Sequence, residues 1–171
     1  KLYDQDIITL FGNHHFSVIT TAGHTQEHIT YFSQNQSSPI LFSGDTLFAG
    51  GCGRLLGGKA EQLHNSLKRL AELPDNTQVY CAHEYTLSNL AFASHVEPDN
   101  STIKKRVMIE AEKRRQNIPT IPTSIGLEKQ TNPFLRIDNE QVKMAVAHYW
   151  HTTYTNNPDI VTDLRRWKDE F

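Results

Sequence analysis

Cysteine is scarce in this sequence, and so are long apolar runs and an excess of charge of either sign. The two cysteines among 171 residues, Cys52 and Cys81, are too few for a disulfide framework and are expected to be reduced thiols. No stretch approaches the roughly 20 consecutive apolar residues of a membrane span, and no apolar signal core follows Lys1–Asp6. These absences argue against a membrane protein and predict a cytoplasmic location.

The charges nearly cancel, because 17 Lys and Arg residues stand against 19 Asp and Glu residues. Such a balance gives no support to a nucleic-acid partner. Two basic runs, Lys104–Arg106 and Lys113–Arg115, leave a nucleic-acid or partner-binding helical module as an alternative, but Glu110 and Glu112 lie between them. We therefore interpret this segment as the solvated surface of a helix.

Residue patterns divide the chain into a mixed part and a helical part. The spacing of Leu63, Leu67 and Leu70 predicts an amphipathic helix that ends before Pro74. Turn-forming residues at 97–100 separate a region of mixed strands and helices, 1–98, from a helical region, 99–171. Strands are expected at Phe16–Thr20, Ile29–Ser33, Ile40–Ser43 and Thr77–Cys81, and helices at Ala60–Leu73, Leu87–Phe92, Ser101–Gln116, Gln141–Trp150 and Val161–Glu170.

Three of the predicted strands lead into a good metal ligand at their carboxyl-terminal side, namely His24, Asp45 and His83. Imidazole nitrogen and carboxylate oxygen suit zinc and related divalent metals, and a carboxylate can bridge two metals with its two oxygens. The three residues are too far apart in the sequence for a local zinc finger, so the fold would have to bring them together. Surface or hydrogen-bonded structural roles remain the alternative for any one of the nine histidines.

Several longer motifs resemble those of one family. The motifs are Gly23-His24-Thr25-x-x-His28, Leu41–Phe48, Gly51-Cys52-Gly53-Arg54, Tyr80–Thr86, His95–Pro98, Asn132–Arg136 and Arg165–Asp169. In this order they are similar to glyoxalase II, hydroxyacylglutathione hydrolase, of the metallo-β-lactamase superfamily. The resemblance implies part of an αββα metallo-β-lactamase-type sandwich in residues 1–98, followed by an all-α glutathione-binding domain in residues 99–171.

The resemblance also implies a reaction and a metal site. The complete protein would hydrolyse S-2-hydroxyacylglutathione thioesters, such as S-lactoylglutathione, by means of a metal-bound hydroxide. Two divalent metals are implied, with zinc preferred over iron or manganese. His24 would bind one metal, His83 the other, and Asp45 would bridge them. No further catalytic residue is implied beyond the metal-bound water.

Four residues would bind glutathione by the same resemblance: Arg54, Tyr85, Arg165 and Lys168. Cationic side chains suit this ligand because glutathione presents carboxylates. A solvated helix face is the alternative for Arg165 and Lys168 when the resemblance is set aside. The implied partner is a small molecule rather than nucleic acid or a membrane, and the complete protein is expected to be a monomer.

One motif of the family is absent from this sequence, namely Thr-His-x-His-x-Asp-His. In the family it lies upstream and supplies most of the remaining metal ligands. We therefore expect the chain to correspond to the carboxyl-terminal two thirds of a glyoxalase II and to be hydrolytically inactive by itself. A persulfide dioxygenase-like enzyme with one iron, or a non-catalytic fragment, are the alternatives.

Overall fold

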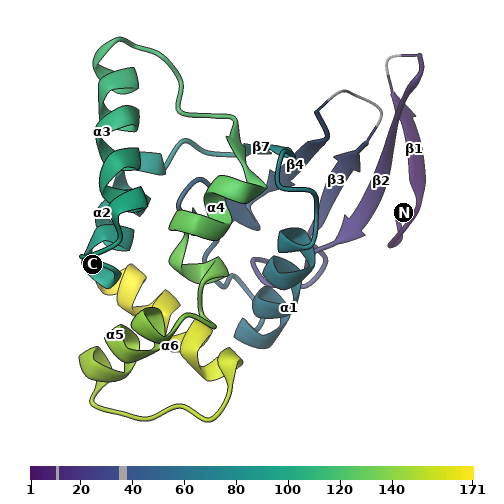
Figure 1. The fold of residues 1–171 in the computed structure, drawn as a ribbon. Helices are drawn as coiled ribbons and strands as arrows, with labels where there is room; N and C mark the ends of the chain where they lie inside the picture. Colours follow the sequence, from purple (N-terminus) through teal and green to yellow (C-terminus); the bar gives the residue numbers. More distant parts are fainter. Residues whose placement is uncertain (11, 35–37) are drawn as a thin grey trace.

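A mixed β-sheet forms the centre of the computed structural model, which describes residues 1–10, 12–34 and 38–171 (Figure 1). The sheet has six strands in the order β1-β2-β3-β4-β7-β8. β4 and β7 run parallel, whereas the other neighbouring strands are antiparallel. The strands are β1 (Ile7–Leu10), β2 (His14–Thr20), β3 (Ile29–Ser33), β4 (Ile40–Gly44), β7 (Gln78–Cys81) and β8 (Thr123–Ser124), and β5 (Leu47–Phe48) and β6 (Gly51–Cys52) form a separate hairpin.

Helices make up most of the second half of the chain. Four of the α-helices directly follow a residue whose side-chain oxygen accepts hydrogen bonds from free backbone N–H groups: Asn100, Ser124, Asn139 and Asn156. The helices are α1 (Ala60–Ala71), α2 (Thr86–Val96), α3 (Ser101–Arg115), α4 (Ile125–Thr131), the short 3₁₀ helix η1 (Pro133–Leu135), α5 (Glu140–Trp150) and α6 (Asn157–Glu170). Within the described ranges, none has the length and apolar character that crossing a bilayer requires.

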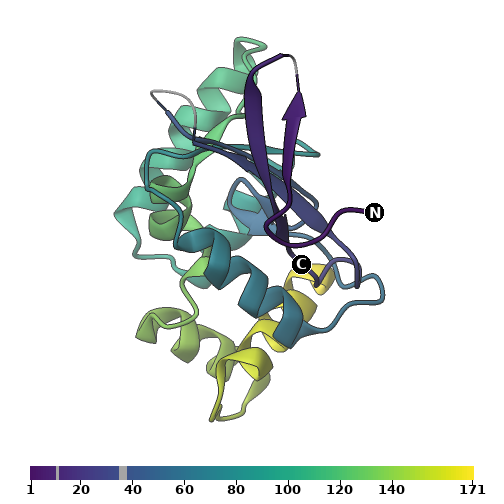
Figure 2. The same cartoon turned by 90° about the vertical axis from the view of Figure 1, so that its right-hand side faces the viewer.

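Helix α1 connects the sheet to the helical region. Its leucines Leu63, Leu67 and Leu70 are fully buried at the predicted spacing, and they belong to one core cluster with Leu41 and Val79 of the sheet. Figure 2 shows α1 beside the sheet, with α5 and α6 beyond it. One face of the sheet therefore packs on α1, which in turn packs on the helical region.

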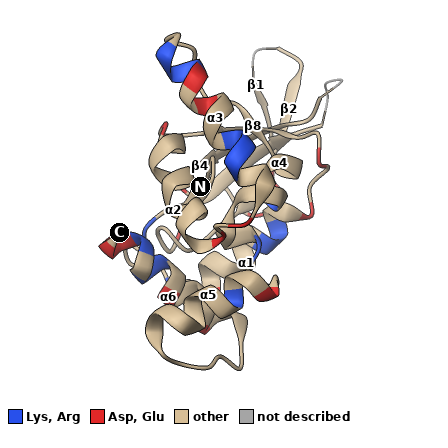
Figure 3. Ribbon diagram, turned by 60° about the vertical axis from the view of Figure 1, so that its left-hand side comes forward, with Lys and Arg blue, Asp and Glu red and all other residues tan. Residues whose placement is uncertain are grey.

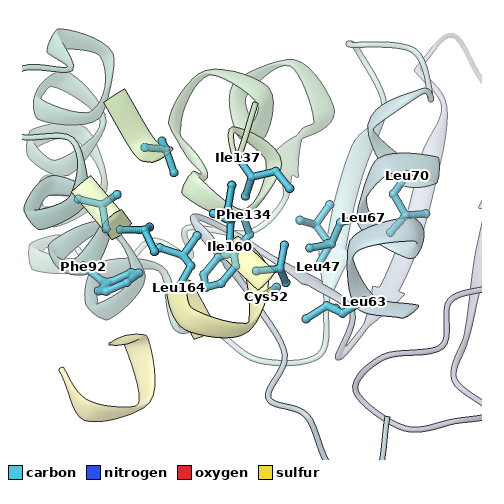
Figure 4. Close-up of a cluster of buried hydrophobic side chains, with 14 of the residues drawn as sticks. Leu47, Cys52, Leu63, Leu67, Leu70, Phe92, Phe134, Ile137, Ile160 and Leu164 are labelled. Atoms are coloured by element: carbon cyan, nitrogen blue, oxygen red, sulfur yellow. The ribbon is translucent and has the colours of Figure 1, made fainter. Parts of the chain in front are cut away.

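One cluster of buried hydrophobic side chains spans both halves of the chain (Figure 4). Phe134 of η1 and Leu164 of α6 are buried in the same cluster as Leu47 and Cys52 of the small hairpin. Burial of side chains of this size contributes roughly 1.5–3 kcal/mol each. The helical region is thus fixed directly against the hairpin that follows β4.

The sequence predicts that the first basic run of α3 is a solvated surface. The structure corrects this prediction for one of its residues. Arg106 is only 3% exposed, because its guanidinium is paired with a buried carboxylate, Glu128. In the second run, Lys113 pairs with Glu110 and Arg115 with Glu112. In Figure 3, parts of the ribbon coloured for basic and for acidic residues follow one another along the outer end of this helix.

The amino-terminal segment is attached to α1 by an ion pair that gives a pH-dependent stability. Arg69 donates two hydrogen bonds, of 2.7 and 2.8 Å, to the Asp4 carboxylate, and they hold the pKa of Asp4 at about 2 instead of 3.8. The pair therefore contributes fully above pH 3.8, and its contribution is lost as the pH falls through about 2.

We expect the Asp4→Asn substitution to lower the free energy of unfolding by about 1 kcal/mol at neutral pH, a value discounted for the partial exposure of both groups. The difference between the variant and the parent should shrink when both are unfolded by urea near pH 2. A difference of the same size at both pH values would show that the pair does not stabilise the fold.

Candidate functional site

One pocket of about 620 Å³ lies where the sheet, the β5–β6 hairpin and the helices α2 and α6 meet. Its lining includes all seven residues that the sequence singles out: His24, Asp45, Arg54, His83, Tyr85, Arg165 and Lys168. Residues far apart in the sequence are thus brought together in one pocket.

His24 lies in the loop between β2 and β3, and its ring is held by the loop that follows β6. The Nδ1 atom lies 2.8 Å from the carbonyl oxygen of Arg54. Since a carbonyl can only accept, Nδ1 must carry the proton in this contact. The lone pair of the neutral ring is then on Nε2, the atom that remains available to bind a metal.

Asp45 directly follows β4, and His28 holds its backbone. The N–H of Asp45 donates to Nε2 of His28 over 3.1 Å, while Nδ1 of His28 lies within 3.0 Å of the hydroxyl groups of Thr21 and Thr46. Burial lowers the pKa of His28, which favours the neutral ring that accepts this hydrogen bond. His28 is part of the quoted motif, but the sequence gives no sign of this positioning role.

His83 follows β7, the parallel neighbour of β4, so it emerges at the same edge of the sheet as Asp45. Its Nε2 atom lies 3.4 Å from Oδ1 of Asp45. The ring stacks on Tyr85, with 5.1 Å between the ring centroids, and lies 6.1 Å from the ring of Phe48. These contacts fix the ring plane while leaving half of the side chain accessible from the pocket.

The donor types match a divalent metal, but the set is small. Two imidazoles and one carboxylate face the pocket, and this is the chemistry that zinc prefers. Within the described part of the chain, no group of three or more His, Cys, Asp or Glu side chains is arranged to hold a metal ion. Asp45 and His83 are the close pair, and His24 lies near them in the same lining.

The Gly51–Arg54 loop packs against the metal-ligand candidates without side chains in between. A Cβ atom on Gly53 would lie 2.0 Å from the carbonyl oxygen of Asp45 and 3.2 Å from Nδ1 of His24. Only glycine allows this approach. Cys52 is buried beside it as a free thiol, and burial raises its pKa to about 11, which is unsuitable for a nucleophile at neutral pH.

Basic side chains from the loop after β6 and from α6 form another part of the pocket lining, called here the cationic wall. Nζ of Lys168 is half-buried and lies 3.2 Å from the carbonyl oxygen of Ser88, and burial, together with Arg165, lowers its pKa. Arg54 is exposed at the rim, with Nε 3.3 Å from Asp169. Tyr85 stands half-exposed just before α2. The arrangement suits an anionic ligand.

Arg165 is buried under this wall rather than exposed on a helix face. Its guanidinium donates to the carbonyl oxygen of Cys52 over 3.0 Å and to Asp169 over 3.1 Å. Arg165 therefore places a buried positive charge in the pocket lining, and its hydrogen bond to the carbonyl oxygen of Cys52 holds the backbone of β6.

Further lining residues escaped the sequence-based reasoning, among them Phe48, Ser88 and Asn89. Asn89 lies one helical turn after Tyr85 on α2, and its amide donates to the carbonyl oxygen of Ala49 over 3.1 Å. The spacing from Tyr85 is the signal that could have indicated it.

Comparison with known structures shows the fold. A metallo-beta-lactamase from Staphylococcus aureus aligns with a TM-score of 0.56 and 23% identity, over 98% of this chain and 42% of that chain. ETHE1 from Myxococcus xanthus aligns with a TM-score of 0.56 and 26% identity, over 95% of this chain and 56% of that chain. The fold is an α/β domain of the metallo-β-lactamase type followed by a helical domain.

Curated relatives are more similar in sequence. Hydroxyacylglutathione hydrolase from Pseudomonas savastanoi pv. phaseolicola is 48% identical over 170 residues, which are 99% of this chain and 65% of the relative. The protein of the same name from Pseudomonas entomophila is 48% identical over 156 residues, which are 91% of this chain and 60% of the relative. The chain thus spans less than two thirds of the length of these relatives.

Two family models together match nearly the whole chain. The model for the metallo-beta-lactamase superfamily matches residues 2–83. The model for the hydroxyacylglutathione hydrolase C-terminus matches residues 84–171, more than half of the chain. The chain therefore belongs to the hydroxyacylglutathione hydrolase family within the metallo-β-lactamase superfamily.

Proposed function

We propose that this chain carries the glutathione site and part of the metal site of an enzyme that hydrolyses S-2-hydroxyacylglutathione to glutathione and a 2-hydroxy acid. The observation that carries the proposal is the single pocket in which Asp45, His83 and His24 face the cationic wall of Arg54 and Lys168. A thioester could lie at the histidine and aspartate side while its peptide part reaches the cations. The names of the 48% identical relatives support the same substrate class.

Membership of the superfamily implies a divalent metal cofactor. We propose zinc, with iron or manganese as alternatives, because the candidate donors are imidazole and carboxylate. When bound, such a metal lowers the pKa of a coordinated water and polarises a carbonyl group. His24 and His83 would hold one metal each, and Asp45, whose Oδ1 lies 3.4 Å from Nε2 of His83, would bridge the two metals.

The chain's own residues would bind and orient the glutathione part. Lys168 and Arg54 offer their charges to its carboxylates, and Tyr85 offers a hydroxyl group from the start of α2. Arg165 would stabilise the same anion from beneath, since its hydrogen bonds are made to Cys52 and Asp169. Cytoplasmic residence and a monomeric complete protein stay predictions.

Binding is tested first with S-methylglutathione, a thioether that cannot be hydrolysed. We expect saturable binding by calorimetry and a dissociation constant about 10-fold higher for the Lys168→Met variant, since a hydrogen bond to a charged group contributes about 1.5–3 kcal/mol. Lys104→Met is the matched control, because Lys104 is exposed on α3. Equal affinities of the Lys168→Met and Lys104→Met variants would show that Lys168 does not bind the ligand.

Hydrolysis is tested in a chimera that joins residues 1–171 to the part of the Pseudomonas savastanoi relative that they do not match. With zinc, the chimera should consume S-lactoylglutathione and release a free thiol, whereas the 171-residue chain alone should not. Absence of zinc-dependent thiol release from the chimera would overturn the proposal. Oxygen consumption by an iron-loaded chimera would instead favour the persulfide dioxygenase-like alternative, which the names of the relatives support less.

A further inference from the structure

A buried ion pair connects α3 and α4 in the helical region. Glu128 is fully buried and Arg106 is 3% exposed, and Nη2 of Arg106 lies 2.6 Å from Oε1 of Glu128. The hydroxyl groups of Thr123 and Thr131 accept further hydrogen bonds from the guanidinium. None of these four residues lines the pocket described above.

The second oxygen of Glu128 reaches the β5–β6 hairpin. Oε2 accepts hydrogen bonds from the N–H of Gly50 over 2.8 Å and from the amide of Asn132 over 3.0 Å. The same amide of Asn132 lies 2.9 Å from the carbonyl oxygen of Gly51 and 3.3 Å from that of Phe48. Glu128 and Asn132 thus bind the turn of the hairpin through its backbone, at a point where Gly50 has a φ of +74°.

This hairpin joins the two sides of the pocket. Asp45, a metal-ligand candidate, precedes β5, and Arg54 of the cationic wall follows β6, so the hairpin connects these two parts of the pocket along the chain. The ring of Phe48 lies 5.4 Å from that of Tyr85 and 6.1 Å from that of His83. A shift of the turn would therefore move both sides of the pocket.

We propose that Glu128, whose buried charge is paired with Arg106, is a positioning residue that sets the β5–β6 hairpin and thereby the glutathione-binding wall. Buried ion pairs stabilise a fold little compared with apolar residues of the same volume. The burial of Glu128 is better explained by the hydrogen bonds that its second oxygen accepts from Gly50 and Asn132. The inference rests on the proposed function in one respect, namely that the ligand of the cationic wall is glutathione.

Two double variants of the 171-residue chain test the proposal. Both remove the ion pair: Arg106→Met with Glu128→Gln keeps an oxygen acceptor for the Gly50 amide, whereas Arg106→Met with Glu128→Met does not. The amide resonance of Gly50 in a ¹⁵N–¹H spectrum should move upfield only in the methionine variant. Affinity for S-methylglutathione should fall about 10-fold in that variant and stay within about threefold in the glutamine variant, since only the methionine variant loses the acceptor for the Gly50 N–H, and the loss of one hydrogen bond corresponds to about a factor of ten.

The unsubstituted chain supplies a measurement that does not depend on how well the variants fold. The hydrogen bond from Gly50 to Glu128 should give a scalar coupling between the Gly50 nitrogen and the carboxyl carbon of Glu128. Absence of this coupling, or equal affinities and equal Gly50 shifts in the two folded double variants, would overturn the positioning role. Failure of the unsubstituted chain to bind S-methylglutathione, with the Gly50 difference intact, would instead count against the proposed function.

Discussion

The Asp45→Asn substitution is expected to lower the affinity of the chain for zinc by at least about 100-fold. Loss of a group that merely supports a ligand costs about 10–100-fold in metal affinity, and loss of a direct donor should cost more. The neutral amide of asparagine removes the negative charge beside His83, whose Nε2 lies 3.4 Å away. The loop should keep its conformation, because His28 binds the backbone N–H of residue 45 rather than its side chain.

Zinc affinity is measured by competition with a chromophoric chelator at neutral pH. The Asp99→Asn variant is the matched control, because Asp99 is exposed in the turn between α2 and α3. An affinity that is unchanged in both variants would mean that Asp45 is not a donor. A loss of equal size in both would point to general electrostatics instead of a ligand.

The Gly53→Ala substitution is expected to cost about 3 kcal/mol or more of unfolding free energy, at the upper end of the usual range for overpacking. The added Cβ would lie 2.0 Å from the carbonyl oxygen of Asp45, a backbone atom that cannot move away as the end of a flexible side chain could. The backbone of Gly53 is not in the left-handed region, so the cost is steric. Urea unfolding followed by circular dichroism gives the value.

Gly57→Ala is the matched control a few residues further along the same loop. Gly57 has a φ of +92° and nothing within 4 Å of an added Cβ, so only backbone strain of about 1–2 kcal/mol is expected. In the Gly53→Ala variant, zinc affinity should fall as well, because His24 and Asp45 are displaced together. If both variants lost the same stability and kept their zinc affinity, close packing of Gly53 on Asp45 would not matter for the site.

Strand-forming residues between turn signals, and the helical spacing of leucines, made much of the fold predictable. The strand at Ile29–Ser33 is confirmed with the predicted bounds, and α1 begins at the predicted Ala60. The sequence does not predict strand β1, because Ile7–Leu10 is largely exposed and shows no alternation between apolar and polar residues. It does not predict helix α4 either, because this helix is only seven residues long and contains Gly126, a poor helix former.

The candidate site was partly predictable for a different reason. His24, Asp45 and His83 each follow a strand, and strand ends that meet at one sheet edge bring such residues together. The supports behind them could not be found in this way. Arg106 has the sequence context of a surface lysine run, and only the fold reveals that it is buried with Glu128.

Strand β8 has a consequence for how the chain can be divided and how it is made. Thr123 and Ser124 lie beyond the predicted boundary at residue 98, yet they pair with β7 and complete the edge of the sheet. A fragment that ends at residue 98 would leave the backbone groups of β7 open to other chains. During synthesis on the ribosome the same edge stays open until β8 has emerged, so the growing chain is most exposed to association in that interval.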